Sequence, residues 1–204
     1  MAQPSEKEHT LKPVSESQFL PPLQKSILLC LAKSQPLNKN QTAHAVKKEY
    51  KASWNALNSL EKKGLITEID TGEYRSREYT RYWLTPAGIF IALIEGIKPE
   101  SLLTKTIKIY PENKTLQCIV EASSVLGTDM YRIAYPAILS KRKLENDDIA
   151  LMMAAQLRKN LSWEQIRGLI SIMKKYPEQF GNFNKQRDQM LENLKKVESI
   201  LKSA

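Results

Sequence analysis

Apolar residues in the stretch 23–33 recur three and four positions apart, which is the spacing of one face of an α-helix. The residues of this face are Leu23, Ile27, Leu28 and Leu31. The run ends at residues 34–36, where Ser-Gln-Pro is typical of a helix terminus. A second, short helix is expected over about residues 40–48. The pattern therefore predicts two consecutive helices joined by a brief turn.

A third helix is predicted by Leu57 and Leu60, which lie three residues apart and face inward. Gly64 follows them as the kind of residue that takes the left-handed conformation at many helix ends. The chain from residue 65 onward suits two strands, with a hairpin tip at Asp70-Thr71-Gly72. We therefore expect three helices followed by a β hairpin.

A new helix is predicted directly after the second strand. Thr85 suits its N-cap, and Pro86 suits the first helical position, which needs no amide donor. The segment 89–94 reads Ile-Phe-Ile-Ala-Leu-Ile and is apolar on all sides. Such a helix needs cover on more than one side, so we expect it to pack against the C-terminal half of the chain or against a second subunit.

This order of elements resembles the winged helix-turn-helix transcriptional regulators of the MarR and PadR type, especially the archaeal ones. The resemblance covers residues 23–96 and is carried by L-x-x-L-E-x-x-G-L-I at 57–66 and L-T-x-x-G at 84–88. It implies a homodimer that binds double-stranded DNA, with the third helix in the major groove and the hairpin, or wing, on the backbone or in the minor groove. Winged helices also serve as protein-interaction subunits of larger assemblies, which is the alternative function.

The third helix carries a polar stripe that we define as Lys51, Asn55, Asn58 and Lys62. These residues are spaced four, three and four apart, so they share one helix face. Asparagine amides pair with adenine edges in the major groove, and lysines meet phosphates or guanine. The polar stripe is therefore a candidate DNA-reading surface, with an ordinary solvated helix face as the alternative.

The other side of the third helix is expected to pack inward through Tyr50, Ser53, Leu57 and Leu60. Trp54 projects between the two faces. It is a candidate DNA-binding residue that would stack on sugar and backbone, and it also suits a partner-protein contact. We expect it to lie at the edge of the core.

Gln41 and Thr42 begin the predicted second helix. Their side chains and the free backbone N–H groups of a helix start suit the positioning of a phosphate, so both are candidate DNA contacts. A capping role for both residues is equally compatible with the sequence.

The predicted wing carries Arg75, Arg77 and Arg81, which share one strand face because residues two apart in a strand point the same way. Arginines at this place would straddle the DNA backbone or enter a narrow minor groove. The alternative is a solubilising edge strand, because charges commonly protect exposed edges and Glu73 and Glu78 are interspersed.

The rest of the chain is predicted to be helical. Residues 1–22 form a polar tail, 23–96 the winged-helix domain, 97–112 a linker containing two prolines, and 113–204 an all-α domain that joins the two chains of a dimer. Helices are expected at 114–126, 129–139, 147–159, 163–176 and 184–202. The predicted fold class is mainly α with a small β wing: an N-terminal winged helix-turn-helix domain plus an all-α C-terminal helical domain.

Two features of the C-terminal half leave alternatives open. Ser162 and Gln165 make a capping box for the helix at 163–176. The last helix has an apolar seam that suits either a symmetry mate or an intrachain contact; its residues are Phe183, Met190, Leu194, Val197 and Leu201. Five further side chains suit either an effector pocket or the core; they are Tyr131, Tyr135, Met152, Met153 and Trp163.

Composition and motifs limit the classes of function that we expect. The net charge of +9 favours a polyanionic partner. The seven glycines form no phosphate loop, and there is no nucleophile elbow or acid–base pair, so we expect neither an enzyme nor a cofactor. Cys30 and Cys118 are isolated and are expected to be small buried hydrophobes. His9 and His44 lack companions at ligand spacing, so no metal site is expected.

Neither a secretion signal nor a membrane span is predicted. The N-terminus is polar, and the longest apolar run, 89–94, is far short of the roughly 20 residues that cross a bilayer. We expect a cytoplasmic, nucleoid-associated protein.

Overall fold

The computed structural model describes residues 20–74, 77–128, 131, 161–181, 185 and 192, with side-chain positions given outside 71–78. The helices are α1 (Pro22–Lys33), α2 (Lys39–Ala45), α3 (Tyr50–Lys62), α4 (Pro86–Ile94), α5 (Pro99–Ile109), α6 (Lys114–Leu126) and α9 (Trp163–Lys175). The strands are β1 (Ile66–Tyr74) and β2 (Arg77–Leu84). The described chain is thus mainly helical with one small antiparallel sheet, as the sequence predicts.

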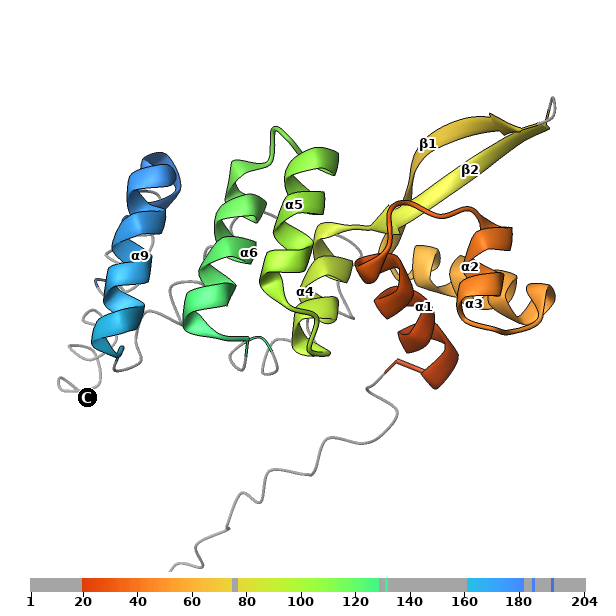
Figure 1. Cartoon of the computed structure of the whole chain (residues 1–204), viewed down its shortest axis with the longest axis horizontal. Helices are drawn as coiled ribbons and strands as arrows, with labels where there is room; N and C mark the ends of the chain where they lie inside the picture. The colour runs from red at the N-terminus through yellow and green to blue at the C-terminus, as the bar shows by residue number, and fades with distance from the viewer. Residues whose placement is uncertain are drawn as a thin grey trace, which may run out of the picture.

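The elements form an elongated row (Figure 1). α1, α2 and α3 pack on one another at one end, and the β hairpin projects from that end beyond the helices. α4 and α5 lie in the middle, α6 packs on α5, and α9 packs on α6 at the opposite end. The three N-terminal helices and the hairpin therefore sit together, away from α9.

Local capping explains where α2 begins. The Asn38 side chain accepts a hydrogen bond from the backbone N–H of Gln41, and the Gln41 side chain accepts one from the backbone N–H of Asn38. This reciprocal pair satisfies two helix-start donors and fixes the first helical residue as Lys39. The helix ends at Ala45, three residues earlier than the predicted limit at 48.

α4 is the centre of the fold, and its cover on all sides confirms the expectation from its sequence. Every residue from Ala87 to Ile94 is buried. Thr85 caps the helix as predicted, because its hydroxyl oxygen accepts from the N–H of Gly88 at 3.1 Å and donates to the carbonyl of Gly64 at 2.6 Å. Burial of each large apolar side chain stabilises the fold by about 1.5–3 kcal/mol.

The segment predicted as a linker is the packed helix α5. Lys105 Nζ donates to the carbonyl oxygen of Ala32 at 2.7 Å, and the Tyr110 hydroxyl donates to the carbonyl oxygen of Leu84 at 2.7 Å. Pro99 occupies the first turn of this helix, where proline is tolerated, and so does not mark an extended connection. The second proline of the segment follows the helix end.

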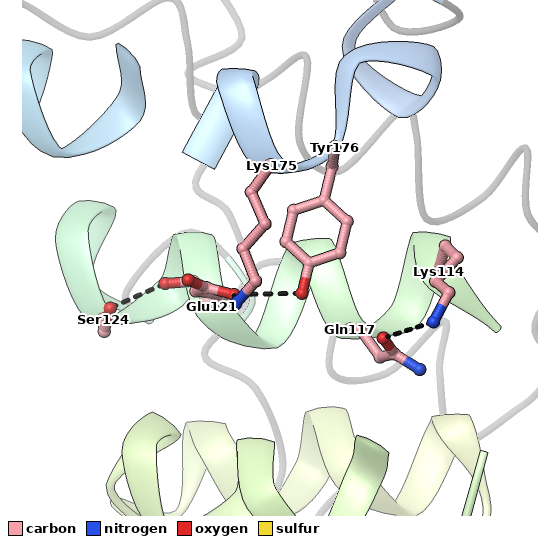
Figure 2. Close-up of polar contacts among 6 residues, drawn as sticks. All are labelled: Lys114, Gln117, Glu121, Ser124, Lys175 and Tyr176. Atoms are coloured by element: carbon pink, nitrogen blue, oxygen red, sulfur yellow. Dashed lines mark hydrogen bonds and ion pairs between the residues drawn. The ribbon is translucent and has the colours of Figure 1, made fainter. Parts of the chain in front are cut away.

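The C-terminal helices α6 and α9 confirm the predicted starts at 114 and 163. α9 has the predicted capping box of Ser162 and Gln165. It is fastened to α6 through Glu121, whose Oε2 accepts from Lys175 Nζ at 2.6 Å and from the Tyr176 hydroxyl at 3.0 Å (Figure 2). The Glu121 carboxylate raises the pKa of Lys175, and burial raises that of Tyr176.

One hydrophobic cluster runs through the described residues, from Leu20 before α1 to Phe180 after α9. Tyr131 lies inside it, with its hydroxyl 3.0 Å from Ser123 Oγ and its ring edge-to-face with Phe90 at 5.2 Å. Tyr131 is therefore a core residue. Trp163 is 69% exposed and belongs neither to this core nor to an enclosed pocket.

The other residues named for an effector pocket, Tyr135, Met152 and Met153, lie outside the described residues. So do the predicted helices at 129–139 and 147–159, apart from residue 131. The predicted helix at 184–202 is described only at residues 185 and 192, and its apolar seam stays a prediction. The predicted tail is described only from Leu20, which is buried and therefore belongs to the folded unit.

The β hairpin extends further than predicted. β1 and β2 stay in antiparallel register from the Ile66–Leu84 pair to the Tyr74–Arg77 pair, with a β-bulge between Glu68 and Asp70. The predicted tip at residues 70–72 is therefore wrong. Cross-strand pairing overrides the turn preference of Asp-Thr-Gly, and the bulge supplies the local bend instead.

Candidate nucleic-acid interface

The polar stripe lies on the outward face of α3. Lys51, Asn55 and Lys62 are exposed, and Asn58 between them is half-buried. The opposite face of α3 buries Ser53, Ala56, Leu57 and Leu60 against the other N-terminal elements. Apart from Tyr50, the inward and outward faces follow the predicted phase of the helix.

The neighbouring charged residues of α3 point elsewhere. Lys63 Nζ donates to Oε1 of Gln24 at 2.8 Å, so this lysine lies toward α1. Glu61 lies on the hairpin side, where its charge acts on the Tyr82 hydroxyl. The polar stripe therefore presents two cations and two amides with no carboxylate among them.

The flank of α3 beside the hairpin carries two exposed aromatic side chains. Tyr50 is 43% exposed and Trp54 is 40% exposed, with their rings edge-to-face at 5.5 Å. The expectation that Tyr50 packs inward is wrong, whereas the partly covered Trp54 agrees with the expected position at the edge of the core. The two positions lie at the margin of the buried face, where no residue of the described chain covers them enough to bury them.

Lys39 fills the seam between this aromatic pair and the hairpin. Its Nζ lies 4.1 Å from the Trp54 ring centroid and 5.6 Å from that of Tyr82 on β2. A cation over an aromatic face is attracted by the ring quadrupole. Burial, aided by Glu68 and Glu61, raises the pKa of Tyr82 to about 12. Tyr82 therefore stays neutral, and its ring forms one side of the seam that Lys39 fills.

Sequence reasoning missed Lys39 and the exposure of Tyr50. A usable signal for Lys39 was the Asn38–Gln41 spacing, which sets the start of α2 one residue earlier than expected. Leu37, next to that cap, exchanges two backbone hydrogen bonds with Tyr82 at 2.9 and 3.2 Å. This pairing brings the start of α2 to β2, and nothing in the local pattern predicts it.

Arg81 is the one candidate hairpin arginine whose side chain the structure describes. Its Nε donates to Asp70 Oδ1 at 2.7 Å, and its guanidinium also binds Asp70 Oδ2. The hydrogen bond to Asp70 raises the pKa of Arg81. The charge is therefore compensated in the free protein. Arg75 and the side chain of Arg77 lie outside the described parts.

Gln41 and Thr42 have structural roles in α2. Thr42 is fully buried and its hydroxyl donates to the carbonyl oxygen of Asn38 at 2.9 Å, so its side chain cannot reach a phosphate. Gln41 is exposed, but its side-chain oxygen is engaged by the backbone of Asn38. The capping interpretation therefore holds for Gln41, and Thr42 is removed from the candidate interface.

The remaining candidate groups are the two cysteines and the side chains that could bind a metal ion. Cys118 is fully buried and burial raises its pKa to about 12, which makes it an unreactive thiol. Cys30 is only half-buried. Among the described residues, no group of three histidine, cysteine or carboxylate side chains is placed to hold a metal ion. No helix in the same ranges is long and apolar enough to cross a membrane.

The structure thus brings together the polar stripe, the Tyr50–Trp54 pair and Lys39 at the hairpin end of the molecule. It leaves Arg81 paired with an acid and Thr42 in the core. Comparison with known proteins gives no match to any family model, to any curated protein or to any solved structure.

Proposed function

We propose that the chain is a sequence-specific double-stranded DNA-binding transcriptional regulator of the winged helix-turn-helix kind. One observation carries the proposal: Lys51, Asn55 and Lys62 are exposed along one face of a 13-residue helix, with Asn58 between them. A helix of this width enters the major groove, where amides and cations read base edges and phosphates. The net charge of +9 supports a polyanionic partner.

In this proposal α3 lies in the major groove and the β hairpin meets the backbone or the adjacent minor groove. The seam of Lys39 and Trp54 lies between the two and faces the intervening backbone. The regulator acts as a homodimer in the cytoplasm at the nucleoid, joined through its C-terminal helices, and carries out no catalysis. Sedimentation of the full chain with and without a palindromic duplex tests the dimer.

The test of DNA binding is fluorescence anisotropy of labelled duplexes selected from random sequence, measured across salt concentrations. The logarithm of affinity should fall with the logarithm of salt by about 0.9 per phosphate contact. Lys62→Ala should reduce that slope by about 1, and Asn55→Ala should relax base preference by about 1–3 kcal/mol at one position. Lys108→Gln, an exposed lysine on α5, is the control for loss of one charge.

A protein-interaction subunit is the second candidate, and exposed apolar side chains favour it. Tyr50 and Trp54 on α3, together with Trp163 and Met173 on α9, are at least 40% exposed. Aromatic residues and methionine are enriched in protein interfaces. In that case duplex affinity would be weak, and replacing Asn55 or Lys62 would leave it unchanged.

A further inference from the structure

The turn after α2 departs from the other helix ends of the same kind. Three described helices end in a Schellman motif, in which the second residue past the C-cap donates to the carbonyl five residues earlier and the first donates to the carbonyl three residues earlier. In α3 these residues are Gly64 and Leu65, and in α4 they are Gly96 and Ile97. Both of those helices use glycine at the left-handed position and a buried apolar residue after it.

α2 makes the same motif from two lysines. The backbone N–H of Lys47 donates to the carbonyl of His44 at 3.1 Å, and that of Lys48 donates to the carbonyl of Ala43 at 3.2 Å. Lys47 has φ +52°, the one positive φ at a non-glycine residue in the described parts of the chain. Both lysines are exposed, so Lys48 lacks the apolar contact that Leu65 and Ile97 make.

Neither backbone geometry nor packing accounts for a lysine at position 47. Glycine would adopt the same φ without the clash between Cβ and the following carbonyl, and this chain uses glycine twice in the same motif. Strained non-glycine residues of this kind cluster at functional sites. The side chain of Lys47 is therefore the feature to be explained.

The two lysines border an open hollow of about 450 Å³ between α2 and the start of α3. Its lining residues are Asn40, Ala43, His44, Lys47, Lys48 and Tyr50. The lining contains two lysines, an imidazole and an amide and has no carboxylate. Glu49 is exposed next to Lys48 and is the nearest acid along the chain. The hollow begins where the polar stripe begins, since Tyr50 and Lys51 are adjacent.

We infer that this hollow binds a phosphoryl group, held by Lys47 and Lys48 with His44 and Asn40 as further donors. The chemistry is common to two sources, a backbone phosphate of duplex DNA and a free phosphate. The DNA source rests on the proposed function, and it would place a phosphate at the end of the groove that α3 enters. Binding of free phosphate does not depend on that function.

The deciding variant is Lys47→Gly in the full chain, because its effects on stability and on binding are opposite. Removing the strained φ should raise the thermal unfolding midpoint. Removing the charge should weaken duplex binding at least about threefold at low salt, whereas Lys108→Gln changes it by less than about 1.5-fold. Glu49→Gln should strengthen duplex binding, because it removes the nearest acid.

The second arm titrates inorganic phosphate alone and follows the His44 ring resonances by NMR. A saturable shift that Lys47→Gly abolishes, with duplex affinity unaffected by that variant, supports the hollow as a site for free phosphate. If the chain binds no duplex at all, the proposed function fails, but this arm still tests whether the hollow binds phosphate. Unchanged duplex affinity in Lys47→Gly together with no saturable phosphate shift at His44 overturns the inference.

Discussion

Arg81 on β2 and Asp70 on β1 face each other across the hairpin and form a bidentate ion pair. The two residues are direct neighbours in the sheet register, one position beyond the β-bulge. Such a pair compensates the one hairpin arginine whose side chain is described. In the proposed DNA complex, the contribution of Arg81 to affinity would therefore depend on Asp70 as well.

Replacing Asp70 by asparagine should release the guanidinium. We expect Asp70→Asn to bind duplex DNA about 3–10-fold more tightly at low salt and to steepen the dependence of affinity on salt. Because the pair is solvent-exposed, the free energy of unfolding should change by less than about 1 kcal/mol. Anisotropy titrations and urea unfolding measure the two effects, and equal affinity for both proteins would show that the hairpin does not meet the phosphates.

Trp54 offers a second test of the interface. Trp54→Ala should weaken duplex binding by about 3–10-fold, because it removes a stacking surface and the ring that holds the Lys39 ammonium at 4.1 Å. Trp163→Ala is the matched control, since Trp163 is also exposed but lies on α9. Equal losses in the two variants would place Trp54 outside the interface.

Gly88 should tolerate no side chain. A Cβ at this position would lie 1.9 Å from the carbonyl oxygen of Leu65, a backbone atom that already accepts from the N–H of Thr85 at 3.1 Å. We expect Gly88→Ala to cost more than about 3 kcal/mol, measured by urea unfolding. Gly181→Ala meets open space and should be close to neutral, so a similar loss there would contradict the steric explanation.

Tyr110 should make the fold sensitive to alkali. Burial raises its pKa from 10.0 to about 12, so the folded state holds a proton that the unfolded state releases first. The corresponding stability is complete below pH 10 and is lost as pH rises to 12, by up to about 2 kcal/mol. Tyr110→Phe should be less stable at neutral pH, but its stability should decline less steeply between pH 10 and 12. Denaturant unfolding at each pH measures both effects.

Sequence patterns predicted those elements whose boundaries are set by residues close in the chain. Thr85 with Pro86, and Ser162 with Gln165, mark helix starts through local hydrogen bonds and a restricted φ, and both starts are confirmed. α6 spans the predicted residues 114–126 because an Asn113 cap and a glycine terminator flank it.

Several features that depend on distant residues were mispredicted. The tip of the hairpin is decided by the register between two strands, which outweighs the turn preference of residues 70–72. The exposure of Tyr50 depends on what covers the margin of α3, and helical phase alone does not reveal that. The pairing of Arg81 with Asp70 requires the bulge that brings them opposite each other.

The docking of α5 has a mechanical consequence. Lys105 on α5 donates to the carbonyl oxygen of Ala32 near the end of α1, and Tyr110 at the C-cap of α5 donates to that of Leu84 at the end of β2. These two hydrogen bonds connect the hairpin to the C-terminal half of the chain. A fragment cut after residue 96 would lose both ties and strip one side of α4. We therefore expect such a fragment to be less stable than the same residues in the full chain, and a displacement of α5 to move the end of β2 with it.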